Sequence, residues 1–154
     1  MKRPPPTDDA LLTGSQRKKL DLVYRKAEYR VIAGHKTLVF RIGEYDAATE
    51  AALFQQLPVK REWAILTPCN PRSQEATQEL NSFYYHELRD VLALSHSLSL
   101  PAINHDPLGS WQDEPGFAIA DADPLLVREL GKRFLQNAYV SVKAGEAPRL
   151  IWLA

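Results

Sequence analysis

The sequence has almost no cysteine, no excess of charge of either sign and no long apolar run. Cys69 is its single cysteine, which excludes an intramolecular disulfide and an all-cysteine zinc site and fits a reducing compartment. The longest stretch without Asp, Glu, Lys or Arg, residues 91–105, contains two histidines, three serines and Pro101. Such a polar stretch cannot serve as a membrane span, so we expect a protein without a membrane segment.

Charge and export signals are equally sparse. Nineteen Lys and Arg balance nineteen Asp and Glu, so the chain as a whole is not a polycation built for DNA or for an acidic membrane surface. The N-terminus carries three prolines at positions 4–6 and two aspartates at 8 and 9, where a signal peptide needs uninterrupted apolar residues. We therefore expect a cytoplasmic protein.

Familiar catalytic and cofactor-binding motifs are also missing. The chain has no Gly-x-x-x-x-Gly-Lys-Ser/Thr loop, no Gly-x-Gly-x-x-Gly and no Gly-x-Ser-x-Gly, which removes the common nucleotide-binding and serine-hydrolase signatures. His86 and Glu87 match half of a zinc-protease motif, but Asp90 stands where a second histidine is required. The sequence names no cofactor and predicts no metal site.

What is present is the composition of one globular domain. The 154 residues are 45% hydrophobic and 25% charged, and this length buries a sizeable core without disulfides or metal. Residues 1–14 combine the proline run, a charged pair and Gly14 with little apolar content, which predicts a flexible N-terminal arm. A single domain without internal repeats is expected over residues 15–154.

Hydrophobic periodicity predicts an α/β domain, with an α+β arrangement as the alternative. Four helices are expected: one capped by Ser15, one capped by Asp46, one over residues 76–92 and one capped by Asp123 with Pro124 at its first position. Six to seven strands are expected over residues 28–33, 36–42, 63–67, 100–103, 116–120, 138–142 and 150–153. Helical crossovers between strands predict a mixed sheet that includes parallel pairs.

The first candidate site is the loop from Thr67 to Pro71, where an apolar strand ends before a long helix. Ligands often bind beyond the carboxyl ends of strands, and the free N–H groups of a helix start attract anions. Asn70, or Ser73, is equally suited to capping the helix. Cys69 is a weak candidate nucleophile, because a lone cysteine is most often a small buried side chain.

The second candidate lies in residues 104–115. From Asn104 to Asp123 the chain has five acidic residues and no Lys or Arg. Glu114 is a candidate general acid or base if it is buried, and Trp111 could stack on a ligand or plug the core. His105 has the chemistry of a metal ligand, but no recognised metal spacing is present.

The third candidate is Gln136 with Asn137, at the join of a predicted helix and strand. Two adjacent amides can recognise a carboxamide, a base edge or a phosphate. Asn137 also suits a left-handed residue at a helix end, whereas Gln136 does not. The sequence leaves open whether these three segments meet in space.

The ordered set Trp63-Ala-Ile-Leu-Thr67, Asn70-Pro71, Asn81, Trp111 with Glu114-Pro115, and Phe134-x-Gln136-Asn137-Ala138 resembles a small bacterial cytosolic domain family of unknown function. The likeness covers roughly residues 28–154. The resemblance implies a single cytosolic domain and points to the same positions without giving them a role. The chain departs from the family pattern at Pro68 and Cys69.

Two functions compete at this stage. The first is a pocket for a small polar or nucleotide-like metabolite, with catalysis left open, formed by Thr67, Asn70, Asn81, Trp111, Glu114, Gln136 and Asn137. The second is an interaction module that binds nucleic acid or an acidic protein through the basic N-terminal helix and arm. The pocket is the leading hypothesis, because polar residues meet the ends of predicted elements. The alternative rests on residues 1–30, which contain eight basic and four acidic residues.

Overall fold

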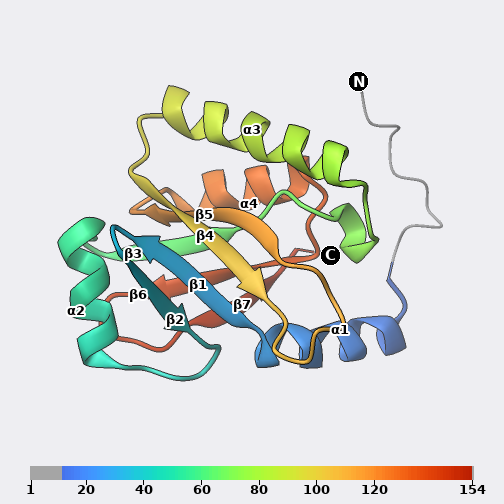
Figure 1. The fold of residues 1–154 in the computed structure, drawn as a ribbon, viewed down its shortest axis with the longest axis horizontal. Helices are drawn as coiled ribbons and strands as arrows, with labels where there is room; N and C mark the ends of the chain where they lie inside the picture. Colours follow the sequence, from blue (N-terminus) through green and yellow to red (C-terminus); the bar gives the residue numbers. More distant parts are fainter. Residues whose placement is uncertain (1–11, 154) are drawn as a thin grey trace.

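A computed structural model describes residues 12–153 of the chain. The helices are α1 (Gly14–Lys26), α2 (Ala47–Gln56), α3 (Gln78–Leu94) and α4 (Pro124–Arg133), with a short 3-10 helix at Pro71–Ser73. The strands are β1 (Glu28–Ala33), β2 (Lys36–Phe40), β3 (Glu62–Leu66), β4 (Ser99–His105), β5 (Glu114–Ala120), β6 (Ala138–Lys143) and β7 (Arg149–Trp152) (Figure 1). The four helices and seven strands confirm the predicted α/β domain.

Local chemistry explains most element boundaries. The Asp46 carboxylate accepts a hydrogen bond from the Thr49 N–H at 3.0 Å, and Asp123 caps α4 ahead of Pro124, as the sequence predicts. The helix α1 begins one residue before Ser15, because Thr13 and not Ser15 is its N-cap. Residues 1–11 of the predicted arm lie outside the described residues.

The sheet differs from the predicted mixture of parallel and antiparallel pairs. Its strand order is β2-β1-β4-β5-β3-β6-β7, and all six described pairings are antiparallel. The two strands joined by α3, β3 and β4, do run in the same direction, but β5 lies between them. In the same way β3 lies between β5 and β6, which α4 joins. Helices α3 and α4 thus each carry the chain past one strand. That strand pairs antiparallel with both of the strands that the helix connects.

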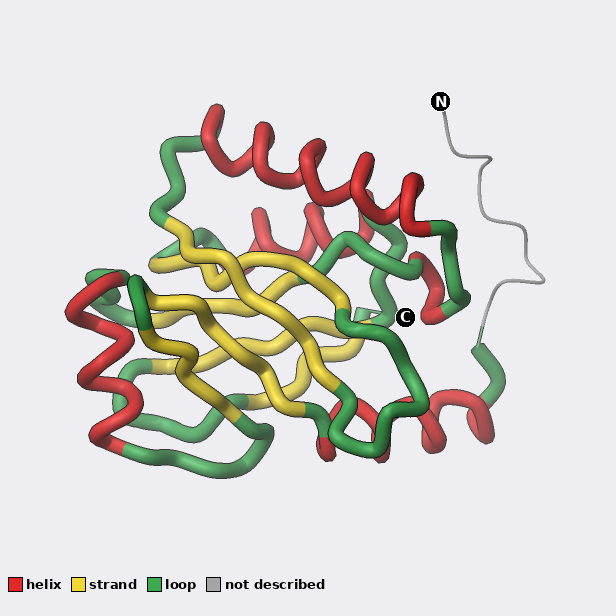
Figure 2. Tube along the Cα trace, viewed as in Figure 1, coloured by secondary structure: helices red, strands yellow, loops and turns green. Residues whose placement is uncertain are grey.

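Both faces of the sheet are buried around its centre. On one face α3 and α4 pack side by side, and on the other α2 covers the end of the sheet away from α1 (Figures 1 and 2). Strand β3 contributes to both layers: Trp63 and Ile65 belong to the core under α2, whereas Ala64 and Leu66 belong to the core under α3 and α4. This position makes the end of β3 a well-supported platform for a site.

The first helix is attached differently, through aromatic and polar contacts. No residue of α1 is buried. The Trp152 indole N–H donates to the Asp21 carboxylate at 3.0 Å, the Arg17 guanidinium lies 4.6 Å from the centre of the Trp152 ring, and the Tyr24 ring lies 5.7 Å from it. Helix α1 is therefore held to the last strand of the sheet, β7.

Asp121 fixes the start of β3 from the end of the neighbouring strand β5. Its carboxylate accepts hydrogen bonds from the backbone N–H groups of Lys60 at 2.8 Å, Arg61 at 2.8 Å and Glu62 at 3.2 Å. We expect Asp121→Ala to lower the free energy of unfolding by about 1–3 kcal/mol, because three N–H groups lose an ionised acceptor. Asp121→Asn should cost less, since Asn keeps an acceptor and tolerates the φ of 50° at this position. Urea denaturation measures both, and equal midpoints for the wild type and the Ala variant would refute the role.

Within residues 12–153, no helix combines the length and the apolar character needed to cross a membrane.

Candidate functional site

A cavity of about 60 Å³ opens at the edge of the sheet where β3 and β4 end and β5 and β6 begin. It has room for a few water molecules or for the head group of a small ligand. All three segments singled out in the sequence reach it. Its polar and aromatic lining includes Tyr24, Tyr29, Thr67, Asn70, Ser73, Asn104, His105, Asp106, Trp111, Gln112, Glu114 and Gln136.

The loop after β3 is fixed by its own polar groups. The Thr67 hydroxyl donates to the Pro115 carbonyl at 2.8 Å and accepts from the Cys69 N–H at 3.1 Å. The Gln136 side-chain amide donates to the Cys69 carbonyl at 3.0 Å. Thr67 and Gln136 therefore tie the loop to β5 and to the turn after α4, and this joins the three predicted segments.

Asn70 is the centre of the polar network. Its Oδ1 accepts from the Ala76 backbone N–H at 3.0 Å and from the Asn81 side-chain amide at 2.9 Å, and the Asn70 N–H donates to Asn81 Oδ1 at 2.9 Å. Because the backbone N–H of Ala76 can only donate, the orientation of the Asn70 amide is determined. Its Nδ2 then donates to Glu114 Oε2 at 2.8 Å. Asn81 positions Asn70 from behind and does not line the cavity.

Glu114 is the carboxyl group of the site whose pKa is raised by burial. Its side chain is partly exposed, and it lies against the cavity beside Asn70. Burial raises the pKa of Glu114 to about 7, and the Asn70 hydrogen bond opposes this rise only in part. A carboxyl group with such a pKa populates both protonation states near neutral pH, which suits a general acid or base.

Cys69 is placed for packing rather than for reaction. The thiol is 2% exposed and donates to the Pro115 carbonyl at 3.4 Å. Burial raises the pKa of Cys69 to about 11, so the thiolate needed for attack is scarce at neutral pH. The geometry therefore gives no support to Cys69 as a nucleophile.

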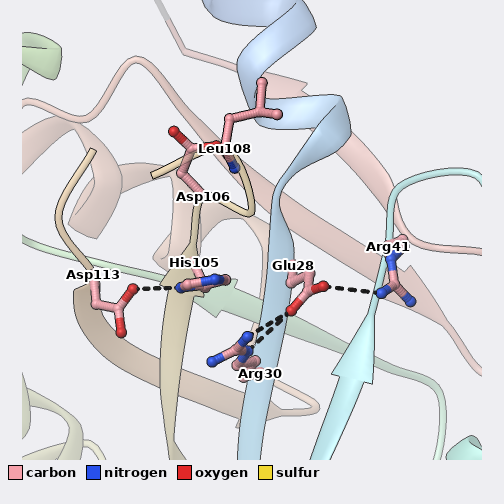
Figure 3. Close-up of polar contacts among 7 residues, drawn as sticks. All are labelled: Glu28, Arg30, Arg41, His105, Asp106, Leu108 and Asp113. Carbon is pink, nitrogen blue, oxygen red and sulfur yellow. Dashed lines mark hydrogen bonds and ion pairs between the residues drawn. The ribbon is translucent and has the colours of Figure 1, made fainter. Parts of the chain in front are cut away.

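The loop between β4 and β5 holds Trp111 at the cavity. The Asp106 carboxylate accepts from the backbone N–H groups of Leu108, Ser110 and Trp111 at 3.0, 2.9 and 3.2 Å. Figure 3 shows this loop beside His105, whose Nδ1 lies 2.7 Å from Asp113 Oδ1. On the neighbouring strands Glu28 pairs with Arg30 and Arg41. The acidic residues of this region are thus engaged locally, and the described residues contain no cluster of three or more metal-ligating side chains.

Tyr24 and Ser73 join the site without any signal in the sequence. Their hydroxyl groups are hydrogen bonded to each other, and the Asn137 amide donates to Ser73 Oγ at 2.9 Å. Asn137 is 2% exposed and supports Ser73 from behind, whereas Gln136 lines the cavity. Asn137 is also not the left-handed residue at the end of α4, because Leu135 has that conformation, with a φ of 54°. Tyr24 fits the apolar stripe of a helix equally well, so its polar role depends on a contact 49 residues away.

The backbone after β3 is strained. Asn70, Arg72 and Ser73 have φ values of 46°, 61° and 56°, in the left-handed region that costs a residue other than glycine energy. Asn70 does not cap α3 with its side chain; Thr77 does. Strain of this kind persists where the surrounding structure imposes it, and it is concentrated at functional sites.

Gly116 allows β5 to approach β3 at the cavity. A Cβ atom at this position would lie 2.3 Å from the Leu66 carbonyl oxygen and 2.8 Å from Thr67 Cα. An isolated glycine inside a predicted strand is a recognisable signal of close backbone approach. Sequence analysis did not single out Gly116, although a lone glycine inside a predicted strand could have revealed it.

Comparison with known proteins gives a match to one family model and no function. No curated protein and no solved structure matches this chain. One family model matches a segment that contains every residue predicted for the pocket, from Thr67 to Asn137. This segment is shorter than residues 28–154, over which the sequence motifs suggested a resemblance. It confirms the resemblance to a domain of unknown function: residues 66–139 match the family described as "Protein of unknown function (DUF3293)".

Proposed function

We propose that this protein binds a small polar ligand in the cavity, with Glu114 as the group that shares or exchanges a proton with it. The observation that carries the proposal is the convergence of Thr67, Glu114 and Gln136 on one concave site that also has aromatic walls. Ligand sites typically combine an apolar lining with a few fixed polar groups and a titratable residue of perturbed pKa.

The polar groups are held in place before any ligand arrives. Asn70 receives two hydrogen bonds at Oδ1 and gives one to Glu114, and Asp106 fixes the loop that carries Trp111. Fixed polar groups lower the entropic cost of binding. With a pKa of about 7, Glu114 also gives the site the capacity for proton transfer.

The competing proposal, a partner bound by the basic N-terminal helix, gains no comparable observation. Arg25 pairs with Asp21 at 2.7 Å, and Arg17 lies over Trp152. Val23 and Tyr24 face the cavity. Part of the basic surface of α1 is therefore used to hold the helix in place, and binding of nucleic acid or of an acidic protein remains a prediction from the sequence.

A thermal-shift screen against amino acids, nucleotides, common metabolites, divalent metals and short nucleic acids tests the proposal. A ligand at a hundred times its Kd should stabilise the protein by about 2.7 kcal/mol, and each kcal/mol should move the midpoint by about 2–4 °C. We expect Glu114→Gln and Asn70→Ala to reduce the shift, and Glu146→Gln, at an exposed turn, to leave it unchanged. A compound that still shifts the melting temperature of both site variants would be shown to bind outside this cavity.

A further inference from the structure

Thr67 and Gln136, two of the polar side chains that line the cavity with Glu114, have already used their hydrogen-bond donors. The Thr67 hydroxyl donates to the Pro115 carbonyl. The Gln136 amide donates to two carbonyls, those of Cys69 at 3.0 Å and Phe134 at 3.3 Å. Since a side-chain amide has two N–H groups, Gln136 has none left for a ligand.

The same residues keep acceptor oxygens for a ligand. In residues 12–153, Glu114 Oε2 receives the Asn70 hydrogen bond, and neither Glu114 Oε1 nor Gln136 Oε1 has a hydrogen-bond partner. Both side chains line the cavity. Neither oxygen belongs to the fully buried polar atoms that lack a partner, so both are open to a molecule that enters.

The charges of the lining point the same way. The described residues around the cavity include the carboxyl groups of Glu114 and Asp106, the imidazole of His105, which is paired with Asp113, and no Lys or Arg. A phosphate or carboxylate ligand would meet no permanent cation, and such ligands are normally held by Arg, Lys or helix N–H groups. The faces of Trp111 and Tyr24 can instead attract a cation through their ring electrons.

We infer that the ligand presents a protonated nitrogen, of an amine or amidine, to the oxygens of Glu114 and Gln136. The inference rests on the proposed function and narrows it: a nucleotide-like metabolite bound through its phosphates does not fit the site. An ammonium group beside Glu114 would also favour ionisation of the carboxyl, which burial alone disfavours. The cavity, at about 60 Å³, suits a head group of a few non-hydrogen atoms.

Three four-carbon probes with different head groups test the inference: n-butylammonium, n-butanol and n-butyrate. Each is titrated at pH 8 into the full chain, and NMR follows the indole N–H of Trp111 and the backbone amides around Asn70. We expect n-butylammonium to bind in the millimolar range and at least tenfold more tightly than the other two. Glu114→Gln should weaken it at least tenfold, and Glu146→Gln should not change it.

The outcomes separate this inference from the proposed function. If n-butyrate or n-butanol binds at the cavity as tightly as n-butylammonium, the nitrogen class is overturned while the site survives. If Glu114→Gln leaves the affinity for n-butylammonium unchanged, the nitrogen class is overturned as well. If no probe and no compound of the thermal-shift screen perturbs Trp111 or Asn70, both proposals fail. Should the Glu114 variant not fold, the order of the three affinities in the wild type decides.

Discussion

Glu114→Gln should make the protein more stable at pH 8 and leave its stability at pH 4 unchanged. The pKa of Glu114 is about 7 in the folded chain against an ordinary value of 4.5. Between these values the folded state holds more protons than the unfolded state, so the free energy of unfolding falls as pH rises from 4.5 to 7. Glutamine removes this loss. Because the carboxyl is partly exposed to the cavity, we expect a gain of about 1–3 kcal/mol above pH 7.

Urea denaturation at pH 4, 6 and 8 measures this difference directly. Glu146→Gln, which also removes one carboxylate, should follow the wild type at all three pH values because its side chain is exposed. If the Glu114 variant is no more stable than the wild type at pH 8, the ionised Glu114 carboxylate does not destabilise the folded state. A gain in stability together with a loss of ligand binding would identify Glu114 as a residue kept for function.

Among substitutions that add one methyl group at the site, we expect Gly116→Ala to destabilise the protein most. The new Cβ would overlap the Leu66 carbonyl oxygen, at 2.3 Å, and the backbone of Thr67. Neither contact can be relieved by rotating a side chain, so β3 and β5 must separate. We expect the free energy of unfolding to fall by about 3 kcal/mol or more, and ligand binding to fall with it because Thr67 and Glu114 lie on the two displaced segments.

Gly14→Ala is the matched control for the added methyl group. No atom lies within 4 Å of a Cβ at Gly14, and the residue opens α1. Alanine favours helix, so this variant should be unchanged or more stable by up to about 1 kcal/mol. Thermal and urea denaturation of the two variants give the comparison, and similar midpoints for both would contradict the close approach of the strands.

The elements of the fold were predictable where the cause is local. Asp46 and Asp123 mark helix starts through hydrogen bonds to residues two or three positions along the chain. Gly34 and Gly145, with φ values of 64° and 82°, mark the turns between β1 and β2 and between β6 and β7. Strand pairing was not predictable in this way. A helix between two strands indicates their common direction, but the strand that lies between them comes from elsewhere in the sequence.

The candidate site follows the same division. Thr67, Glu114 and Gln136 were indicated because each lies where a strand or helix ends, and ends gather at one edge of a sheet. Their roles against one another depend on contacts that span more than 40 residues, such as Asn70 with Glu114. Tyr24 belongs to an unremarkable helical stripe until Ser73 is placed beside it. Periodicity carries no information on such distant partners.

The attachment of α1 to Trp152 has a consequence for the time at which the cavity forms. The hydrogen bond between Asp21 and Trp152 joins residues 131 positions apart, and the cavity is lined both by Tyr24 of α1 and by Leu150 of β7. During synthesis α1 can complete its docking only after β7 has left the ribosome. Contacts of such long range form slowly because closing the loop costs entropy first. The site should therefore be among the last parts of the chain to become ordered, after the layers around β3 have begun to assemble.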